Sequence, residues 1–119
     1  MAFEIEGITQ IDVKELKETL KDNETIVIDI REHEEYVAAH IPGLPLIPMS
    51  EIIDVIDEFE KDRAYVLVCR SGRRSQETSK FFKMNEIDNV KNFSGGMLEW
   101  DEVIEVGEEN IVKDVKDIY

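Results

Sequence analysis

The segment TIVIDI at residues 25–30 constrains the fold of this chain more than any other. Its nearly continuous run of β-branched side chains is typical of a strand that is buried on both faces, as strands are in a parallel sheet. A second short apolar run, at residues 65–68, has the same character, and we expect further strands at residues 6–11 and 89–93. Parallel neighbours need crossover connections, which are usually helices. The sequence therefore predicts an α/β domain.

The segments between these predicted strands have helical patterns. Asp12 is followed three residues later by Glu15, the arrangement of a capping box, which predicts a helix from residue 13 onward. A cap at Ser50 predicts another helix, with one apolar face formed by Ile52, Ile53, Ile56 and Phe59. Further helices are expected over residues 32–39, 76–84 and 97–106. We therefore expect a mostly parallel central sheet flanked by helices on both faces.

Prolines and the C-terminal residues set the limits of this regular structure. The IPGLP segment at residues 41–45 predicts a turn, and residues 46–48 are expected as an edge strand, because an edge tolerates proline. We expect one domain over residues 1–100, since a chain of 119 residues suffices for a single core. A helical C-terminal extension is expected over residues 101–119, packed on the domain or used for association. Its apolar residues would share one helical face: Ile111, Val112, Val115 and Ile118.

Cys69 is the only cysteine of the chain and directly follows the predicted strand at residues 65–68. With a helix expected from residue 76, the sequence places the thiol at a strand-to-helix turn. Unpaired N–H groups and the positive end of the helix dipole favour an anion at such a turn. Because the thiolate is the reactive form of cysteine, this position predicts an activated nucleophile. A lone cysteine also excludes an intramolecular disulfide.

Positive charge is concentrated beside this cysteine in an otherwise acidic protein. The net charge is -14, from 14 Lys+Arg against 28 Asp+Glu, yet Arg70, Arg73 and Arg74 lie within five residues of Cys69. Arginine makes two-point contacts with oxyanions, so the cluster predicts an anion-binding loop. Alternatively, Arg73 and Arg74 begin a solvated helix face and pair with Glu77. The overall charge argues against nucleic acid or an anionic membrane as a partner.

The N-terminal residues, the apolar content and the single cysteine together predict the cellular compartment of the protein. The first six residues, MAFEIE, have neither a basic start nor an apolar run long enough for a signal peptide. No segment approaches the roughly 20 apolar residues that span a bilayer. A single cysteine fits a reducing compartment, so we expect a cytoplasmic protein with no membrane partner.

Four separated blocks of the sequence, taken in order, resemble the rhodanese-like domains, and the resemblance covers residues from about 9 to 100. The first block resembles the family's Asp-x-Arg…Glu-x-Tyr segment, and the third is similar to its catalytic loop. The blocks are DIREHEEY at residues 29–36, HIPG at residues 40–43, CRSGRRS at residues 69–75, and NFSGG at residues 92–96 with Trp100. Four such blocks in this order are a specific signal.

The resemblance implies a sulfurtransferase of the thiosulfate sulfurtransferase type, which works by double displacement. Cys69 would attack the outer sulfur of a donor such as thiosulfate and become a persulfide. A thiophilic acceptor would then remove the outer sulfur. The implied partners are a small-molecule sulfur donor and acceptor, or a protein persulfide partner, with no nucleic acid and no cofactor.

The other loop residues would bind the anions of this reaction. Three arginines would hold the anionic donor: Arg70, Arg73 and, as the main contact, Arg74. The backbone amides from Ser71 to Ser75 would hold the persulfide, with the hydroxyls of both serines beside it. Gly72 permits the backbone conformation that brings those amides inward.

Two other functions stay open at this point. One is a phosphatase or arsenate reductase, in which the arginine of the cysteine loop falls at the position that Ser75 occupies here. Four residues separate Cys69 from Arg74, and this shorter ring suits one sulfur atom better than a tetrahedral phosphate. The other is a non-enzymatic binding or regulatory module, whose usual mark is a missing cysteine.

Three further residues are predicted to support the loop. Asp29 and Arg31 lie at a strand end and are expected to tie neighbouring loops by charge-assisted hydrogen bonds, unless Arg31 faces the ligand. His40 is expected to order the proline turn through a ring hydrogen bond. We expect no metal site, because His33 and His40 are seven residues apart, too far along a helix for one ion.

Overall fold

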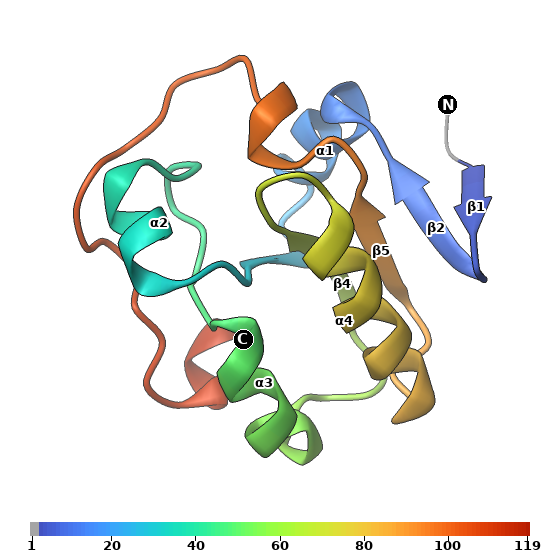
Figure 1. The fold of residues 1–119 in the computed structure, drawn as a ribbon. Helices are drawn as coiled ribbons and strands as arrows, with labels where there is room; N and C mark the ends of the chain where they lie inside the picture. Colours follow the sequence, from blue (N-terminus) through green and yellow to red (C-terminus); the bar gives the residue numbers. More distant parts are fainter. Residues whose placement is uncertain (1–2) are drawn as a thin grey trace.

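Five strands form one sheet at the centre of the computed structural model, which describes residues 3–119 (Figure 1). The strands are β1 Phe3–Ile5, β2 Ile8–Ile11, β3 Thr25–Asp29, β4 Ala64–Val68 and β5 Val90–Phe93. Their order in the sheet is β1-β2-β5-β4-β3. The pairs β2–β5, β5–β4 and β4–β3 are parallel, whereas β1 and β2 form an antiparallel hairpin. The prediction of a mostly parallel sheet is confirmed.

Helices connect the strands and cover the sheet. The α-helices are α1 Val13–Thr19, α2 His33–Ala38, α3 Met49–Val55 and α4 Arg73–Met84, and the 3-10 helices are η1 Ile56–Glu58, η2 Gly96–Glu99 and η3 Val115–Ile118. The capping box predicted before α1 is present. The Asp12 carboxylate accepts the Glu15 N–H at 2.8 Å, and the Glu15 carboxylate accepts the Asp12 N–H at 3.1 Å.

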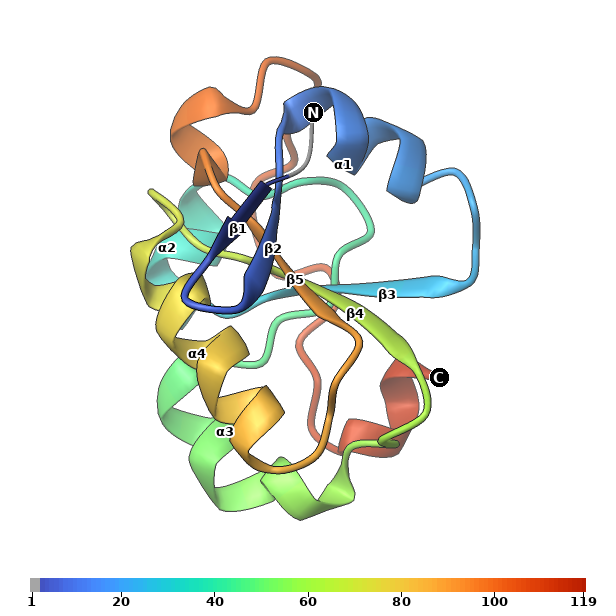
Figure 2. The same cartoon turned by 90° about the vertical axis from the view of Figure 1, so that its right-hand side faces the viewer.

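Both faces of the sheet are buried, which accounts for the continuous apolar runs in β3 and β4. Ile26 and Ile28 of β3 belong to a core cluster that includes Phe82 of α4. Val27, between them, belongs to a second cluster with Leu16 of α1. Figure 2 shows α3 and α4 on one side of the sheet and α1 on the other. The prediction of helices on both faces is therefore confirmed.

The N-terminal strand β1 has no counterpart among the predicted elements. The strand expected over residues 6–11 begins at Ile8, because Glu6 and Gly7 form the turn of a hairpin, with φ of 52° and 81°. All three residues of β1 are exposed, so no buried apolar run marked the strand in the sequence.

Helix α4 begins three residues earlier than predicted. Gly72, with φ 88°, is the N-cap residue, so Arg73 and Arg74 belong to the first turn of the helix. The loop that follows Cys69 is correspondingly short. The backbone N–H groups of residues 70–72 therefore lie between the end of β4 and the start of α4.

Helix α3 also differs from its prediction. Ser50 lies inside the helix, and Pro48 is the N-cap residue, with its carbonyl accepting the Ile52 N–H at 3.2 Å. Ile52 is fully buried, whereas Ile53 is 59% exposed. The predicted apolar face is wrong at Ile53, which lies roughly 100° around the helix from Ile52 and points to solvent.

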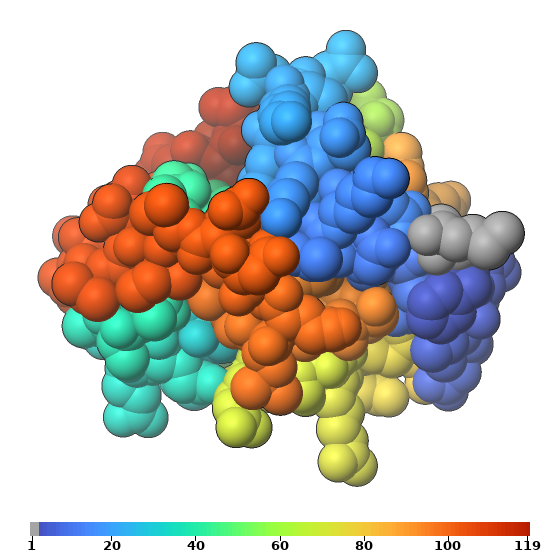
Figure 3. All heavy atoms as spheres, turned by 90° about the horizontal axis from the view of Figure 1, so that it is seen from above, coloured from blue at the N-terminus to red at the C-terminus, as the bar shows by residue number. Residues whose placement is uncertain are grey.

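The chain after β5 is mostly irregular, so the helix predicted over residues 97–106 and the helical conformation predicted for residues 101–119 are wrong. Of these described residues, only those of η2 and η3 are helical. Several backbone groups of the tail bond to other segments: His40 and Glu105, for example, exchange two hydrogen bonds of 2.9 Å. Figure 3 shows this orange segment lying between the blue N-terminal segment and the teal segment around α2.

The tail packs along the domain, and its last residue, Tyr119, contacts Glu60 and Tyr65 near the start of β4. Residues 46–48, expected as an edge strand, contribute only Leu46, which bridges Asp29 on one side and Ile111 of the tail on the other. Val115 is buried in the same core cluster as Ile28. The division into residues 1–100 and 101–119 stays a prediction. None of the helices found in residues 3–119 could span a lipid bilayer.

Candidate functional site

Cys69 directly follows β4, at the carboxyl end of the parallel strands, and its side chain is fully buried. Its Sγ accepts the N–H groups of Gly72 at 3.1 Å and of Ser75 at 3.4 Å, and lies 3.2 Å from the Ser75 Oγ. Amide N–H groups that converge on one atom favour negative charge there. The loop of residues 69–75 therefore gives the sulfur the donors that stabilise an anion.

The loop keeps this shape because it packs against the turn that follows β5. A Cβ on Gly72 would lie 2.1 Å from the Ser94 carbonyl oxygen, and a Cβ on Gly96 would lie 2.4 Å from the Arg70 carbonyl oxygen. Both glycines also have positive φ, 88° and 61°. Only glycine fits either position, so the third and fourth sequence blocks are in direct backbone contact.

The three arginines of the loop have different surroundings. Arg74 makes two hydrogen bonds of 2.7 Å to the Glu35 carboxylate of α2. Arg70 and Arg73 are exposed, and they are the arginines of residues 3–119 that form no ion pair. In this part of the chain neither Arg73 nor Arg74 pairs with Glu77, so the pairing in the alternative interpretation is wrong, whereas Arg73 does lie exposed in the first turn of α4.

The pairing of Arg74 with Glu35 is strong enough to alter the acidity of both groups. The hydrogen bonds from Arg74 lower the pKa of Glu35 from 4.5 to about 2. The same contact raises the pKa of Arg74. The pair joins α2 to the first turn of α4. Arg74, expected as the main contact of the donor, is thus engaged by a side chain of the protein itself.

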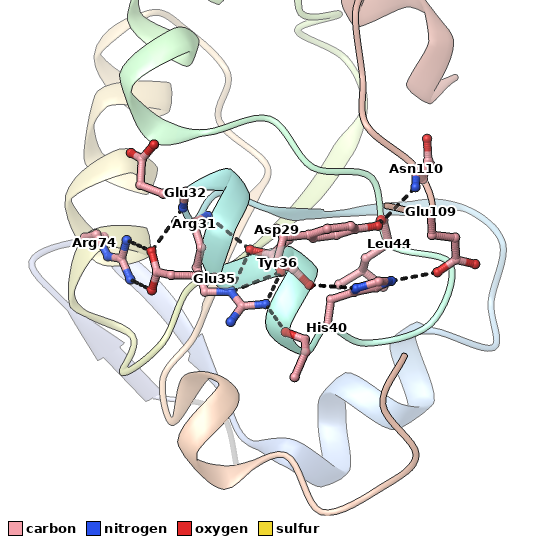
Figure 4. A network of polar contacts seen from close by, with 11 residues as sticks. Asp29, Arg31, Glu32, Glu35, Tyr36, His40, Leu44, Arg74, Glu109 and Asn110 are labelled. Carbon is pink, nitrogen blue, oxygen red and sulfur yellow. Dashed lines mark hydrogen bonds and ion pairs between the residues drawn. The ribbon is translucent and has the colours of Figure 1, made fainter. Parts of the chain in front are cut away.

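Asp29 and Arg31 form a buried ion pair at the end of β3 (Figure 4). The Arg31 Nε donates to Oδ1 of Asp29 at 3.0 Å, and Nη2 donates to Oδ2 at 2.8 Å. The Nη2 also donates to the Ala39 carbonyl at 2.7 Å. The charge-assisted hydrogen bonds expected between neighbouring loops are present, and they tie the end of β3 to the end of α2.

The ring of His40 is fully buried and stacks on Tyr36 with the ring centroids 3.8 Å apart. Its Nδ1 lies 2.9 Å from the Tyr36 carbonyl oxygen, and its Nε2 lies 2.8 Å from a carboxylate oxygen of Glu109 (Figure 4). The same oxygen accepts the Gly43 N–H at 2.9 Å. The ring hydrogen bond expected to order the proline turn is present. Glu109 of the tail bonds both to the His40 ring and to the Gly43 N–H of the turn.

The sequence patterns missed several residues that complete this site. Glu35 and Glu109 meet partners that are 39 and 69 residues away, so no local spacing marked them. The hydroxyl of Ser75 donates to Oδ1 of Asn92, which belongs to a chain of buried amides beneath the loop. Asn92 and Glu35 had a signal in the sequence only as members of the NFSGG and DIREHEEY blocks.

A cavity of about 420 Å³ opens beside the loop. Arg70 borders it, and its apolar wall is formed by Met97, Leu98, Trp100 and Ile104. The exposed guanidinium and the apolar wall together suit an anion that also carries an apolar part.

The two histidines lie in separate contacts. His33 bonds to Glu108, and His40 bonds to Glu109. Nowhere in residues 3–119 do three or more His, Cys, Asp or Glu side chains gather closely enough to hold a metal ion.

Known proteins share both the sequence and the fold. The model of the rhodanese-like domain matches residues 12–103. YtwF of Bacillus subtilis, whose name proposes a sulfurtransferase, is 37% identical over 95 residues, which cover 79% of this chain and 91% of YtwF. YrkF of the same organism, whose name proposes a sulfur carrier, is 33% identical, and the chain spans only 51% of its length. A crystal structure of a rhodanese-like domain protein from Staphylococcus aureus is 36% identical with a TM-score of 0.74, covering 83% of this chain and 98% of that one.

Proposed function

Since the chain belongs to the rhodanese-like domain family, we propose that it is a sulfurtransferase that carries a sulfane sulfur on Cys69 from thiosulfate or a persulfide donor to a thiophilic acceptor. Relatives named for sulfur transfer and sulfur carriage support this reaction class. One observation carries the proposal. The buried Sγ of Cys69 receives two loop N–H groups, and the flanking Arg70 and Arg73 have no carboxylate partner within residues 3–119.

The proposed chemistry moves one sulfur atom in two displacements. The Cys69 thiolate attacks the outer sulfur of thiosulfate, an S–S bond forms, the bond to the sulfite sulfur breaks, and sulfite leaves with the electron pair. The resulting persulfide is an anion, which the N–H groups of Gly72 and Ser75 stabilise. An acceptor such as cyanide or a thiolate then attacks the outer sulfur, and Cys69 leaves as the thiolate.

The three arginines have different roles in the proposed reaction. Arg70 and Arg73 bind the sulfonate oxygens of the donor, because their guanidinium groups are exposed and unpaired in the described chain. Arg74 acts on the reaction indirectly: its pairing with Glu35 fixes the first turn of α4, from which Ser75 donates its N–H to the sulfur. We therefore propose Arg70 and Arg73, and not Arg74, as the main contacts of the donor.

The acceptor enters through the cavity beside Arg70. Its apolar wall and single exposed cation suit an organic thiol or a protein persulfide partner better than a highly charged surface. Cys69 must stay reduced for the reaction, so a reducing compartment such as the cytoplasm is the proposed setting.

The test is sulfur transfer from thiosulfate to cyanide, followed as thiocyanate. We expect activity in the unaltered chain with the kinetics of two successive displacements, and none in Cys69→Ser. Arg63→Ala, which removes an arginine from the opposite end of β4, is a control that should keep the activity. Activity that survives in Cys69→Ser would contradict the proposed nucleophile.

A further inference from the structure

We propose that Asn92 is a positioning residue that turns the hydroxyl proton of Ser75 away from Cys69, so that Ser75 accepts a hydrogen bond from the Cys69 thiol in the resting protein. The proposal rests on the proposed function, since it describes the state from which the nucleophile forms. Its basis is a chain of buried amides that links Cys69 to the N-terminal hairpin.

In this chain of side-chain amides, the donor-to-acceptor direction of the hydrogen bonds is set at the end far from Cys69. Backbone carbonyls lie there, and they can only accept hydrogen bonds. The side-chain nitrogen of Gln76 donates to the Ile5 carbonyl at 2.9 Å, so the side-chain oxygen of Gln76 faces Gln10. The side-chain nitrogen of Gln10 donates to that oxygen at 2.6 Å and to the Ile8 carbonyl at 3.0 Å. Gln10 therefore presents its own oxygen to Asn92.

The orientation of the Asn92 amide, fixed by Gln10, determines which of its atoms faces Ser75. Its nitrogen donates to the Gln10 oxygen at 2.8 Å and to the Gly72 carbonyl at 3.0 Å. The opposite orientation of the Asn92 amide, with its oxygen and nitrogen exchanged, is excluded. Its Oδ1 would then face the Gly72 carbonyl oxygen with no proton between the two buried oxygens. The Oδ1 of Asn92 consequently points at Ser75, and the Ser75 hydroxyl donates to it.

A hydroxyl has a single proton, and Ser75 uses it for Asn92. Only a lone pair of the Ser75 Oγ is left to face the Cys69 Sγ, 3.2 Å away. The proton between these two atoms therefore belongs to sulfur, and the thiol donates to Ser75. This hydrogen bond stabilises the neutral thiol, whereas the N–H groups of Gly72 and Ser75 stabilise the thiolate.

Ionisation of Cys69 disturbs this arrangement in either of two ways. Ser75 keeps its lone pair against the thiolate, or it turns its proton to the sulfur and leaves the buried Oδ1 of Asn92 without a donor. Both raise the free energy of the thiolate state, so Asn92 holds back the ionisation that the loop amides favour. The charged groups around the loop are the pairs Arg74–Glu35 and Arg31–Asp29, Lys80 with its partners Glu6 and Glu77, and the exposed Arg70 and Arg73. None of these groups bonds to Ser75 or Asn92 in the described structure, so they leave the direction of the chain unchanged.

The test is the pH profile of Cys69 alkylation by iodoacetamide, with no sulfur donor present. The midpoint of the profile reports ionisation, and its plateau at high pH reports access to the sulfur. We expect Ser75→Ala to move the midpoint to lower pH, because the thiol loses its acceptor. Asn92→Ala should move it further, by about one pH unit or about tenfold in thiolate at a fixed lower pH, since Ser75 can then donate to the thiolate.

Ser79→Ala is the matched control for these variants. Ser79 is also a fully buried hydroxyl, one turn further along α4, and it donates to the Ser75 carbonyl at 2.7 Å. Its loss should leave the midpoint unchanged. The infrared S–H stretching band gives a second readout that does not need the Asn92 variant to fold: it should lie at lower frequency in the unaltered chain than in Ser75→Ala.

A midpoint that stays in place or moves to higher pH in Ser75→Ala would overturn the proposal, because Ser75 would then be inert or would already donate to the thiolate. Neither alkylation nor infrared spectroscopy involves sulfur transfer. The shifts described above, found together with no transfer from any sulfane donor, would overturn the proposed function and leave the role of Asn92 standing.

Discussion

Arg74 and Glu35 face each other through two hydrogen bonds of 2.7 Å, and this pair fixes the helix turn that supports the Cys69 loop. The contact joins α2 to α4 across 39 residues of sequence. It explains why an arginine so near the cysteine is withdrawn from the anion site. It also makes the stability of the loop depend on the ionisation of one carboxylate.

The first prediction concerns stability and pH. Because the folded pKa of Glu35 is lowered from 4.5 to about 2, its contribution is complete above pH 4.5 and is lost as the pH falls toward 2. At pH 7, Glu35→Gln should lower the free energy of unfolding by about 1–2 kcal/mol, a value reduced for the partial exposure of the pair. Urea unfolding should show the gap closing between pH 4.5 and pH 2, and a gap that is constant with pH would contradict the assignment.

The second prediction separates the arginines by their partners. Arg70→Ala should raise KM for thiosulfate about tenfold, because one charge-assisted contact to the donor is lost. The KM of the unaltered chain should also rise with ionic strength, and that of Arg70→Ala should rise less. Arg63→Ala removes the same charge from an ion pair with Glu60, before β4 begins, and should leave KM unchanged. Equal effects of the two substitutions would show that Arg70 has no specific role.

The third prediction uses two glycines with nearly the same φ. Gly72 has φ 88°, and a Cβ there would lie 2.1 Å from a backbone oxygen, whereas Gly7 has φ 81° and nothing within 4 Å. Gly7→Ala should lower the free energy of unfolding by about 1–2 kcal/mol through backbone strain alone. Gly72→Ala should cost about 1–3 kcal/mol more, because it also overpacks the contact with Ser94. Equal losses in thermal unfolding would mean that the loop is not packed against the turn after β5.

The fourth prediction tests where the domain ends. Removal of residues 101–119 takes away the buried Val115 and leaves Nε2 of His40 without its Glu109 partner. We expect the chain of residues 1–100 to lose on the order of 3 kcal/mol or more, from lost apolar burial and an unsatisfied buried ring nitrogen. Circular dichroism during heating measures the loss. An unchanged Tm would show that the domain is complete at residue 100.

The parts of the fold that could be predicted depend on neighbours in the sequence. Ile26, Val27 and Ile28 alternate between two core clusters, so burial on both faces left a continuous apolar run that identifies a parallel strand. The Asp12–Glu15 cap and the turn after β4 are equally local. The position of Cys69 followed from them, because it required only the end of a strand and the start of a helix.

The parts that could not be predicted depend on contacts between distant segments. The spacing of Ile111, Val112 and Val115 suits a helix, but in the irregular tail Ile111 bridges Leu46, Val112 packs against the core and Val115 is buried. Pattern alone does not distinguish the two conformations, because both bury the apolar residues. The direction of the amide chain beneath Ser75 likewise depends on carbonyls that only the folded backbone brings together.

Intact-mass measurement after mixing with thiosulfate tests the central claim most directly. Cys69 should gain one sulfur atom, cyanide should remove it, and Cys69→Ser should gain none under the same conditions. The adduct forms before any acceptor is chosen, so the result depends only on the first displacement. A chain that gains no sulfur from thiosulfate or from any persulfide donor, while remaining folded with Cys69 reduced, would contradict the account and make this domain a binding module.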